Sequence, residues 1–99
     1  MELSNARHKY YYDSIKSLAI SKGIEYNKAK DIVDSKLSDF IRKSNVENNP
    51  LFIMKNLSGY AQEGYSRNKI TEIIAESFSV RDTNEFANDL IKTLEEAIL

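Results

Sequence analysis

The chain has 99 residues, and its 14 basic and 15 acidic side chains leave a formal net charge of −1. It contains no cysteine and only one histidine, which excludes disulfides, thiolate metal sites and cysteine nucleophiles. A dedicated duplex-binding domain is usually basic, because phosphate neutralisation supplies much of its affinity, so this charge balance counts against that role.

Ninety-nine residues make one domain, and 41% hydrophobic residues beside 29% charged ones are ordinary for a soluble globular protein. The longest apolar run, 51–54, is far shorter than the roughly 18–20 residues that cross a bilayer. Residues 1–9 are polar and lack the apolar stretch of a signal peptide. We therefore expect a single domain over 1–99 in the cytoplasm, which is the host cytoplasm if the protein is viral.

Two long helices are predicted in the first half of the chain, because apolar residues recur there at helical spacing. The first covers about 4–21, turns Tyr11, Ile15 and Leu18 to one face, and ends at Gly23. The second covers about 25–43, and its inner face consists of Tyr26, Ala29, Val33, Leu37, Phe40 and Ile41.

A third helix is predicted over 50–62, after a polar loop, and Gly59 inside it marks either a close helix crossing or an earlier end to the helix. Asn49 is a good N-cap, and Pro50 suits the first helical position, where its missing N–H costs nothing. We expect Gly64 to end this helix and Ser66 to cap the next one. The apolar side of the helix would consist of Leu51, Met54, Leu57 and Tyr60, flanked by Ile53 and Ala61.

Two shorter helices complete the prediction. The last covers about 83–98, and Asp82 with Glu85 has the form of a capping box at its start. No segment alternates in hydrophobicity as a half-buried strand does. The expected fold is therefore all-α, a compact antiparallel bundle of four to five helices. The fourth helix, of about three turns, would turn inward Ile70, Ile73, Ile74 and Phe78.

No set of residues points to catalysis. His8 is the only imidazole, and the nearest acid in sequence, Asp13, lies on another helical face. Asp31 and Asp34 are i, i+3 neighbours, but the apolar stripe of their helix turns both of them outward. The chain has no Glu-x-x-His motif, zinc spacing, phosphate loop or dinucleotide fingerprint. We predict no enzymatic activity, no metal site and no cofactor.

The six tyrosines are the candidates for a contact surface. Tyr10, Tyr11 and Tyr12 are consecutive, so on a helix they cannot all face one core. We expect Tyr10 to meet solvent or a partner, because tyrosine buries much area at low entropic cost. Tyr60 and Tyr65 lie near a predicted turn and form a second candidate contact, for a protein partner or a dimer. The alternative is that these rings are half-buried across a small core, with their hydroxyls in water.

A helix-turn-helix over 57–77 is a different interpretation, with Gly64 as the turn glycine. The small residue usually required four positions earlier is here Tyr60, and two glutamates in the second helix oppose DNA. The residues that suit phosphate and base-edge contacts at the start of that second helix are Arg67, Asn68 and Lys69.

One order of parts matches a known family. A second helix ends in Leu37, Phe40 and Ile41, and a polar loop leads into Asn49-Pro50-Leu51, with Leu57 in the next helix. From about residue 12 to residue 61 this order resembles the pediocin-type (enterocin A-like) bacteriocin immunity proteins. The resemblance implies a four-helix bundle in the producer's cytoplasm that acts on a membrane receptor–bacteriocin complex. The chain departs from the family at 66–80, which is an extra helix where the family has a brief connection.

The abundance of Lys, Ile, Asn and Tyr also resembles small orphan proteins of archaeal viruses and phages. Two functional hypotheses follow from the sequence. The first is a non-enzymatic, immunity-like or other accessory protein that binds a protein partner, which the resemblance places at a membrane. The second is a small viral or plasmid-type regulator that binds nucleic acid through the helix-turn-helix-like segment.

Overall fold

A computed structural model of the chain describes residues 2–99, with side chains from residue 8 onward. The described residues form helices and connecting loops, with no strand, which confirms the all-α prediction. There are six helices in this part of the chain rather than four or five, because the predicted third helix is split in two. They are α1 (Glu2–Lys22), α2 (Tyr26–Ser44), α3 (Phe52–Asn56), α4 (Gly59–Ser66), α5 (Ile70–Val80) and α6 (Glu85–Ile98).

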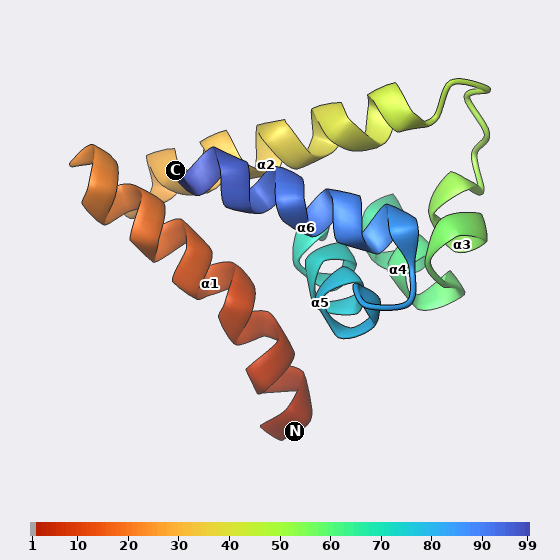
Figure 1. The fold of residues 1–99 in the computed structure, drawn as a ribbon, viewed down its shortest axis with the longest axis horizontal. Coiled ribbons are helices and arrows are strands. Elements are labelled where there is room, and N and C mark those ends of the chain that lie inside the picture. The colour runs from red at the N-terminus through yellow and green to blue at the C-terminus, as the bar shows by residue number, and fades with distance from the viewer. Residues whose placement is uncertain (1) are drawn as a thin grey trace.

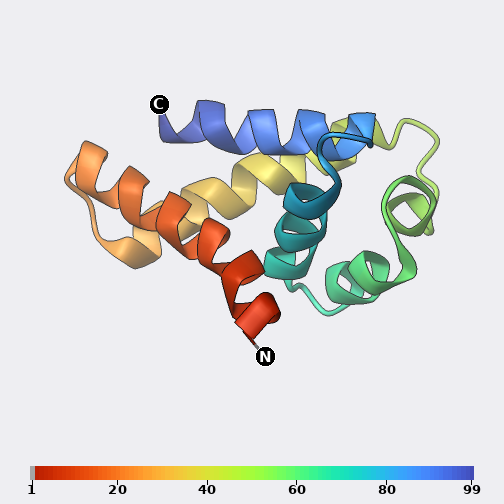
Figure 2. The ribbon, with the colours of Figure 1, turned by 60° about the horizontal axis from the view of Figure 1, so that its bottom comes forward.

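The scaffold of the molecule is made by the longer helices. α2 and α6 pack side by side and run in opposite directions, and α1 packs against both (Figure 1). α5 packs against α1, α4 and α6, while α3 and α4 occupy the far end of the molecule from the α1–α2 connection (Figure 2). None of the helices described from residue 2 onward is both long enough and apolar enough to cross a membrane.

The predicted core faces of the long helices are confirmed in their main parts. Tyr11, Ile15 and Leu18 of α1 are fully buried. Tyr26 is an exception on α2, because it lies in the first turn and is 37% exposed. The buried residues of the other two long helices are Ala29, Val33, Leu37 and Ile41 of α2, and Ala87, Leu90, Ile91 and Leu94 of α6. Of the predicted inner residues of α5, Ile73 and Ile74 are buried, and Ile70 and Phe78 are partly buried.

The end of α1 was predicted correctly. Gly23 has a φ of +64°, a left-handed conformation that glycine adopts without strain. Its amide donates to the Ile20 carbonyl, and the Ile24 amide donates to the Ala19 carbonyl at 3.0 Å. This pair of hydrogen bonds closes the helix and reverses the chain into α2.

The prediction of one continuous helix over 50–62 was wrong, and the alternative of an earlier end near Gly59 is closer to the structure. The helix is interrupted after Leu57. Ser58 adopts an extended conformation, and its hydroxyl accepts a hydrogen bond from the Ala61 amide at 3.1 Å. Ser58 is therefore the N-cap of a new helix, α4, and Gly59 is its first residue. Asn49 and Pro50 precede α3 as a turn, in which the Asn49 side chain accepts from the Leu51 amide, so the helix begins only at Phe52.

The expected end of that helix and the expected cap of the next one were also wrong. Gly64 lies inside α4, and Ser66 is the last residue of α4 instead of the cap of α5. Two residues after the helix, Asn68 has a φ of +59° and reverses the chain, while the Lys69 amide donates to the Gly64 carbonyl at 2.8 Å. Asparagine is the commonest replacement for glycine at such a left-handed helix end, which explains how the helix passes Gly64.

The capping box predicted at Asp82 is absent, because α6 begins two residues later. Asn84 caps this helix by accepting a hydrogen bond from the Ala87 amide at 2.9 Å. The side-chain nitrogen of Asn84 donates to the Asn56 carbonyl at 2.7 Å. One asparagine thus starts α6 and ties it to the end of α3.

Candidate functional site

The clearest candidate for a functional site is a group of large apolar side chains that face solvent on α3, α4 and the residue before α3. Leu51 is 51% exposed, Met54 46% and Tyr60 52%. These residues were predicted to share the apolar side of one helix, and that prediction was wrong, whereas the exposure expected of Tyr60 as a contact residue is observed. The break at Ser58 changes the helical phase, so that Ile53, 1% exposed, takes the inward position instead. We call Leu51, Met54, Tyr60 and the neighbouring Tyr65 the corner surface.

The corner surface is held in place by contacts between α3 and α4 and between α3 and α6. Gln62 of α4 accepts a hydrogen bond from the Met54 amide through its Oε1 atom at 3.1 Å. The ring of Phe52 packs edge-on against Phe86 of α6, with 5.3 Å between the ring centroids. Together with the bond from Asn84, these contacts hold the five-residue helix α3, which is too short to be stable alone.

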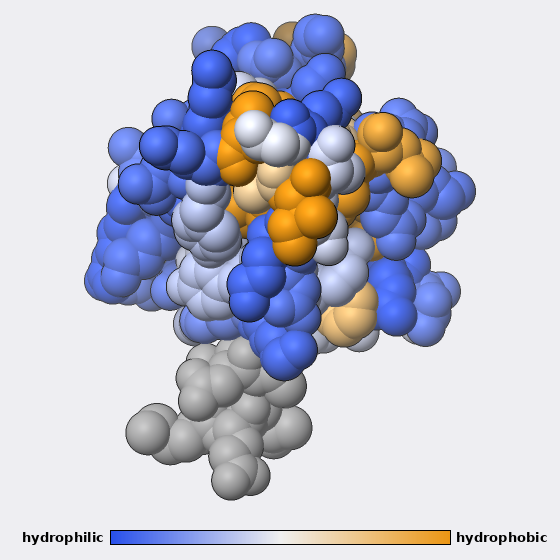
Figure 3. All heavy atoms as spheres, turned by 90° about the vertical axis from the view of Figure 1, so that its left-hand side faces the viewer, coloured by the Kyte–Doolittle hydropathy of each residue, from blue (hydrophilic) through white to orange (hydrophobic). Residues whose placement is uncertain are grey.

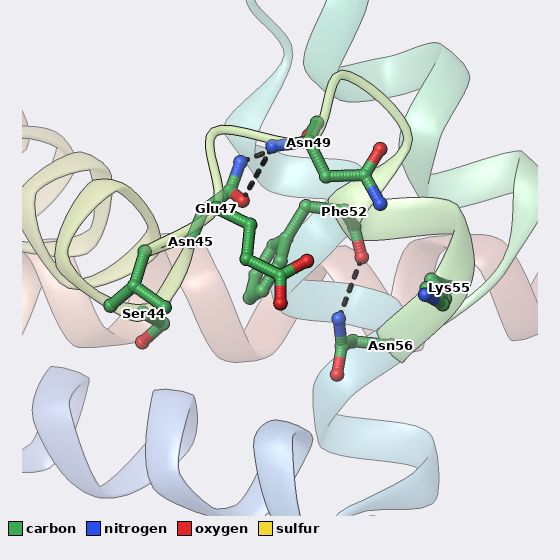
Figure 4. Close-up of a pocket in the computed structure, with 8 residues that line it drawn as sticks. Ser44, Asn45, Glu47, Asn49, Phe52, Lys55 and Asn56 are labelled. Atoms are coloured by element: carbon green, nitrogen blue, oxygen red, sulfur yellow. Dashed lines mark hydrogen bonds between the residues drawn. The ribbon is translucent and has the colours of Figure 1, made fainter.

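The loop that leads into α3 is also ordered by its own side chains. The carboxamide of Asn45 donates to the Asn49 carbonyl at 2.9 Å and accepts from the Asn49 amide at 2.8 Å (Figure 4). Asn48 adopts the left-handed conformation between them, with a φ of +56°. Side chains of this loop line two hollows.

The first hollow, shown in Figure 4, has a volume of about 360 Å³ and carries charge. Its lining includes the Glu47 carboxylate and the Lys55 ammonium, and within the described residues neither group makes a hydrogen bond or an ion pair. We call it the charged hollow. It is lined by Ser44, Asn45, Val46, Glu47, Asn49, Phe52, Lys55 and Asn56.

The second hollow shares Asn45, Asn49 and Phe52 with the first and has a volume of about 390 Å³. Its lining combines aliphatic and aromatic side chains with carboxamides, and Tyr65 of the corner surface belongs to it. We call it the neutral hollow. It is lined by Ile41, Asn45, Asn48, Asn49, Pro50, Phe52, Ile53, Gln62 and Tyr65.

The three tyrosines proposed for partner binding do not lie together. Tyr60 and Tyr65 belong to the corner surface, and Tyr65 is 39% exposed. Tyr10 is partly buried and stacks on Phe78 of α5, with ring centroids 4.2 Å apart, so the expectation that it would be the outward ring was wrong. Burial and the nearby Glu95 raise the pKa of Tyr10. The exposed ring of the consecutive three is Tyr12, at 45%.

Arg67, Asn68 and Lys69 form the three-residue turn between α4 and α5, so a helix–turn–helix arrangement does occur here. The left-handed residue of this turn is Asn68, and the small residue four positions before it is Gly64. The sequence analysis took Gly64 itself as the turn glycine, so the motif lies four residues later in the chain than predicted. A Cβ atom at Gly64 would lie 2.8 Å from the Cβ of Glu72, so the glycine lets α4 and α5 pack closely.

The packing of α5 counts against a nucleic-acid role for this turn. A recognition helix presents an exposed face to the major groove. α5 is instead covered by α1, α4 and α6, and its only exposed residue is Ser79. Arg67 also forms an ion pair with Glu63, while Lys69 and Asn68 line a hollow of about 210 Å³ with Asp34.

Asp34 was predicted to point into solvent, and this was wrong. Its two carboxylate oxygens accept hydrogen bonds from the Tyr11 hydroxyl at 2.5 Å and from the Lys30 ammonium at 2.8 Å. The hydrogen bond to Asp34 raises the pKa of Lys30. The group links α1 to α2, and helical spacing alone could not reveal it because Tyr11 comes from another helix.

The other end of the molecule also exposes apolar atoms. Figure 3 shows hydrophobic surface near the centre of the face where α1 turns into α2, surrounded by hydrophilic atoms. Ile20, 77% exposed, and Leu99, 95% exposed, are the large apolar residues most open to solvent there. Ile24 and Ile98 beside them pack against the core.

Groups that could support chemistry are sparse. His8 is half-buried on α1. Among the described residues, no group of three or more His, Cys, Asp or Glu side chains is placed to hold a metal ion. Comparison with family models, curated proteins and solved structures gives no match. The function therefore has to be inferred from the geometry of the chain itself.

Proposed function

We propose that this chain is a non-enzymatic binding protein that engages a protein partner through the corner surface. The observation that carries this proposal is the exposure of Leu51, Met54 and Tyr60 within ten residues, on the adjoining helices α3 and α4 and on the residue before α3. Exposed apolar residues that gather on adjoining elements are typical of protein-binding sites.

The residue types support the same function. Tyrosine and methionine are enriched where proteins meet, because tyrosine keeps a polar tip and methionine adapts its shape to a partner. The corner surface is held in place by the Gln62–Met54 hydrogen bond and by the Phe52–Phe86 contact. A surface that is already ordered loses little conformational entropy on binding, which favours affinity.

The resemblance to the bacteriocin immunity proteins suggests a membrane receptor complex as the partner. A pull-down from source-cell extract, with membrane and soluble fractions kept separate, tests this. Enrichment of a membrane transporter supports the immunity-like role, and enrichment of a protein only from the soluble fraction replaces it with another accessory role.

The experiment that tests the site compares two variants in that pull-down. Leu51→Ser combined with Met54→Ser and Tyr60→Ser removes the exposed apolar side chains of the corner surface, and we expect recovery of the partner to fall at least tenfold. Ile20→Ser is the matched control, because it removes an even more exposed apolar side chain at the other end of the molecule. Equal recovery with both variants would falsify the proposal.

A parallel nuclease treatment separates the two functional hypotheses. A protein contact through the corner surface is insensitive to nuclease and tolerant of salt. A signal that disappears with nuclease, falls steeply with salt and is lost in Arg67→Ala plus Lys69→Ala would instead identify the nucleic-acid regulator.

A further inference from the structure

We propose that the neutral hollow receives an uncharged peptide segment of the partner, with one aliphatic or aromatic side chain seated between its apolar walls. This inference rests on the proposed protein-binding function and names the chemistry of the segment that is bound.

The lining of the neutral hollow carries no charge. Although 29% of the chain is charged, none of the nine described residues around this hollow is acidic or basic. A charged side chain that entered would lose water without gaining an opposite charge, which is costly. The lining therefore selects against lysine, arginine, aspartate and glutamate in the bound segment.

The apolar part of the lining offers a seat for a hydrophobic side chain. Its open surface comes from Pro50, Phe52 and Tyr65, while Ile41 and Ile53, at 2% and 1% exposure, are covered by these neighbours. The volume of about 390 Å³ falls in the usual range of about 300–1,000 Å³ for sites that take small ligands. This is room for a single anchoring side chain with its adjoining backbone.

The polar part of the lining suits peptide groups. Gln62 uses its Oε1 atom to accept from the Met54 amide, which fixes the orientation of the carboxamide and leaves its Nε2 hydrogens available. Within the described residues, the Asn48 carboxamide and the Tyr65 hydroxyl make no hydrogen bond. Carboxamides both donate and accept hydrogen bonds, as the backbone of a peptide requires.

The charged hollow provides an internal comparison. It shares Asn45, Asn49 and Phe52 with the neutral hollow but adds Glu47 and Lys55. If the loop simply bound any small molecule nearby, both hollows would respond to the same compounds. If the absence of charge in the lining determines which compounds bind, only the neutral hollow responds to an uncharged apolar amide.

The test uses capped amino acids as probes and follows the protein by NMR. N-acetyl-leucinamide and N-acetyl-phenylalaninamide should shift the side-chain amide signals of Asn48 and Gln62 in a saturable manner. N-acetyl-lysinamide and the α-amide of N-acetyl-aspartate, which keeps its side-chain carboxylate, should shift these signals at least tenfold less at the same concentration. Equal shifts with all four probes, or shifts confined to the charged hollow, would overturn the proposal.

Gln62→Glu is the decisive variant. The glutamate keeps an oxygen for the Met54 amide but replaces the free Nε2 donors with a negative charge, so we expect the fold to persist and apolar-probe affinity to fall at least tenfold. Lys55→Gln, in the charged hollow, is the control and should leave probe binding unchanged. Probe binding that Gln62→Glu does not weaken would overturn the site.

The same variant separates this inference from the proposed function. If Gln62→Glu retains the partner while the triple variant of the corner surface loses it, the protein-binding function stands and the neutral hollow is not its seat. If self-association is detected by sedimentation and Gln62→Glu abolishes it, the occupant is a second copy of this chain instead of a separate partner.

Discussion

The α1–α2–α6 scaffold and the segment that carries α3 and α4 follow the same rule of helical spacing, yet only the scaffold has the expected inner face. In the scaffold each helix is long, and its apolar stripe continues over several turns without interruption. In the other segment a serine cap after Leu57 resets the helical phase. A stripe read across such a break assigns inside and outside wrongly, and the residues that it misplaces form the exposed corner surface.

The largest expected effect is a loss of folding stability at alkaline pH, caused by Tyr11 in the scaffold. Burial, then the hydrogen bond to Asp34, raises the pKa of Tyr11 above its ordinary value of 10.0. Because the folded-state pKa exceeds the unfolded one, this contribution to stability is complete below pH 10 and is lost as the pH rises towards the folded value. We expect cooperative loss of helicity in that window, measured by circular dichroism together with phenolate absorbance.

Tyr11→Phe provides the control for the alkaline transition, because it removes the ionisable hydroxyl and keeps the ring. The transition should move to higher pH in this variant. An unchanged transition would show that other groups, among them Tyr10 and Tyr26, whose pKa values are also raised, cause the alkaline unfolding.

The next effect is the contrast between a scaffold leucine and a corner leucine. Leu37→Ala removes a fully buried side chain and should lower the free energy of unfolding by about 2–5 kcal/mol. Leu51→Ala removes a half-exposed one and should change it by less than about 0.5 kcal/mol. Urea denaturation measures both, and a large loss in Leu51→Ala would mean that the corner surface belongs to the core.

A smaller effect is expected at the two glycines of α4. Gly64→Ala forces a Cβ against Glu72, and overpacking typically costs about 1–3 kcal/mol, which outweighs a gain of about 1 kcal/mol in helix propensity. Gly59→Ala meets nothing within 4 Å and should be neutral or slightly stabilising. Thermal denaturation compares the two, and equal melting temperatures would contradict the close packing of α4 on α5.

The smallest effect concerns the serine that sets the break. Ser58→Ala removes the N-cap of α4 and should cost about 1 kcal/mol, measured by urea denaturation. Ser66→Ala, at the position that the sequence analysis expected to be a cap, should have little effect, because its hydroxyl only bonds back to the Gln62 carbonyl at the helix surface. A larger loss of stability in Ser66→Ala than in Ser58→Ala would support the predicted single helix instead.

The sequence was sufficient for the fold class and for the inner faces of the long helices, because these depend on local periodicity. It failed where two signals of similar strength competed. Asn49-Pro50 and Ser58 are both good helix starts, and only the tertiary contacts of Ile53 and Phe52 decide that the helix is broken at the serine. At the next helix end the left-handed residue is Asn68 instead of Gly64, because Gly64 lies inside α4 where it packs closely against Glu72.

The candidate site was only partly predictable for the same reason. Tyr60 and Tyr65 were singled out by residue type and by their nearness to a turn, and both are exposed. Leu51 and Met54 were assigned to the core, so the apolar part of the surface was missed. The signal that could have located it is the conflict itself, two helix starts within ten residues, since local inconsistencies tend to coincide with functional sites.

The isolation of α3 has a consequence for how this chain could change over evolutionary time. This helix has five residues and lies between a loop and the extended Ser58, so it has few backbone hydrogen bonds of its own. The side chains of Asn84 and Gln62 hydrogen-bond to its backbone and hold it in place. Substitutions at its outward positions leave the hydrogen bonding of the long helices untouched. Substitutions there could therefore change what the proposed corner surface binds without disturbing the fold of the long helices.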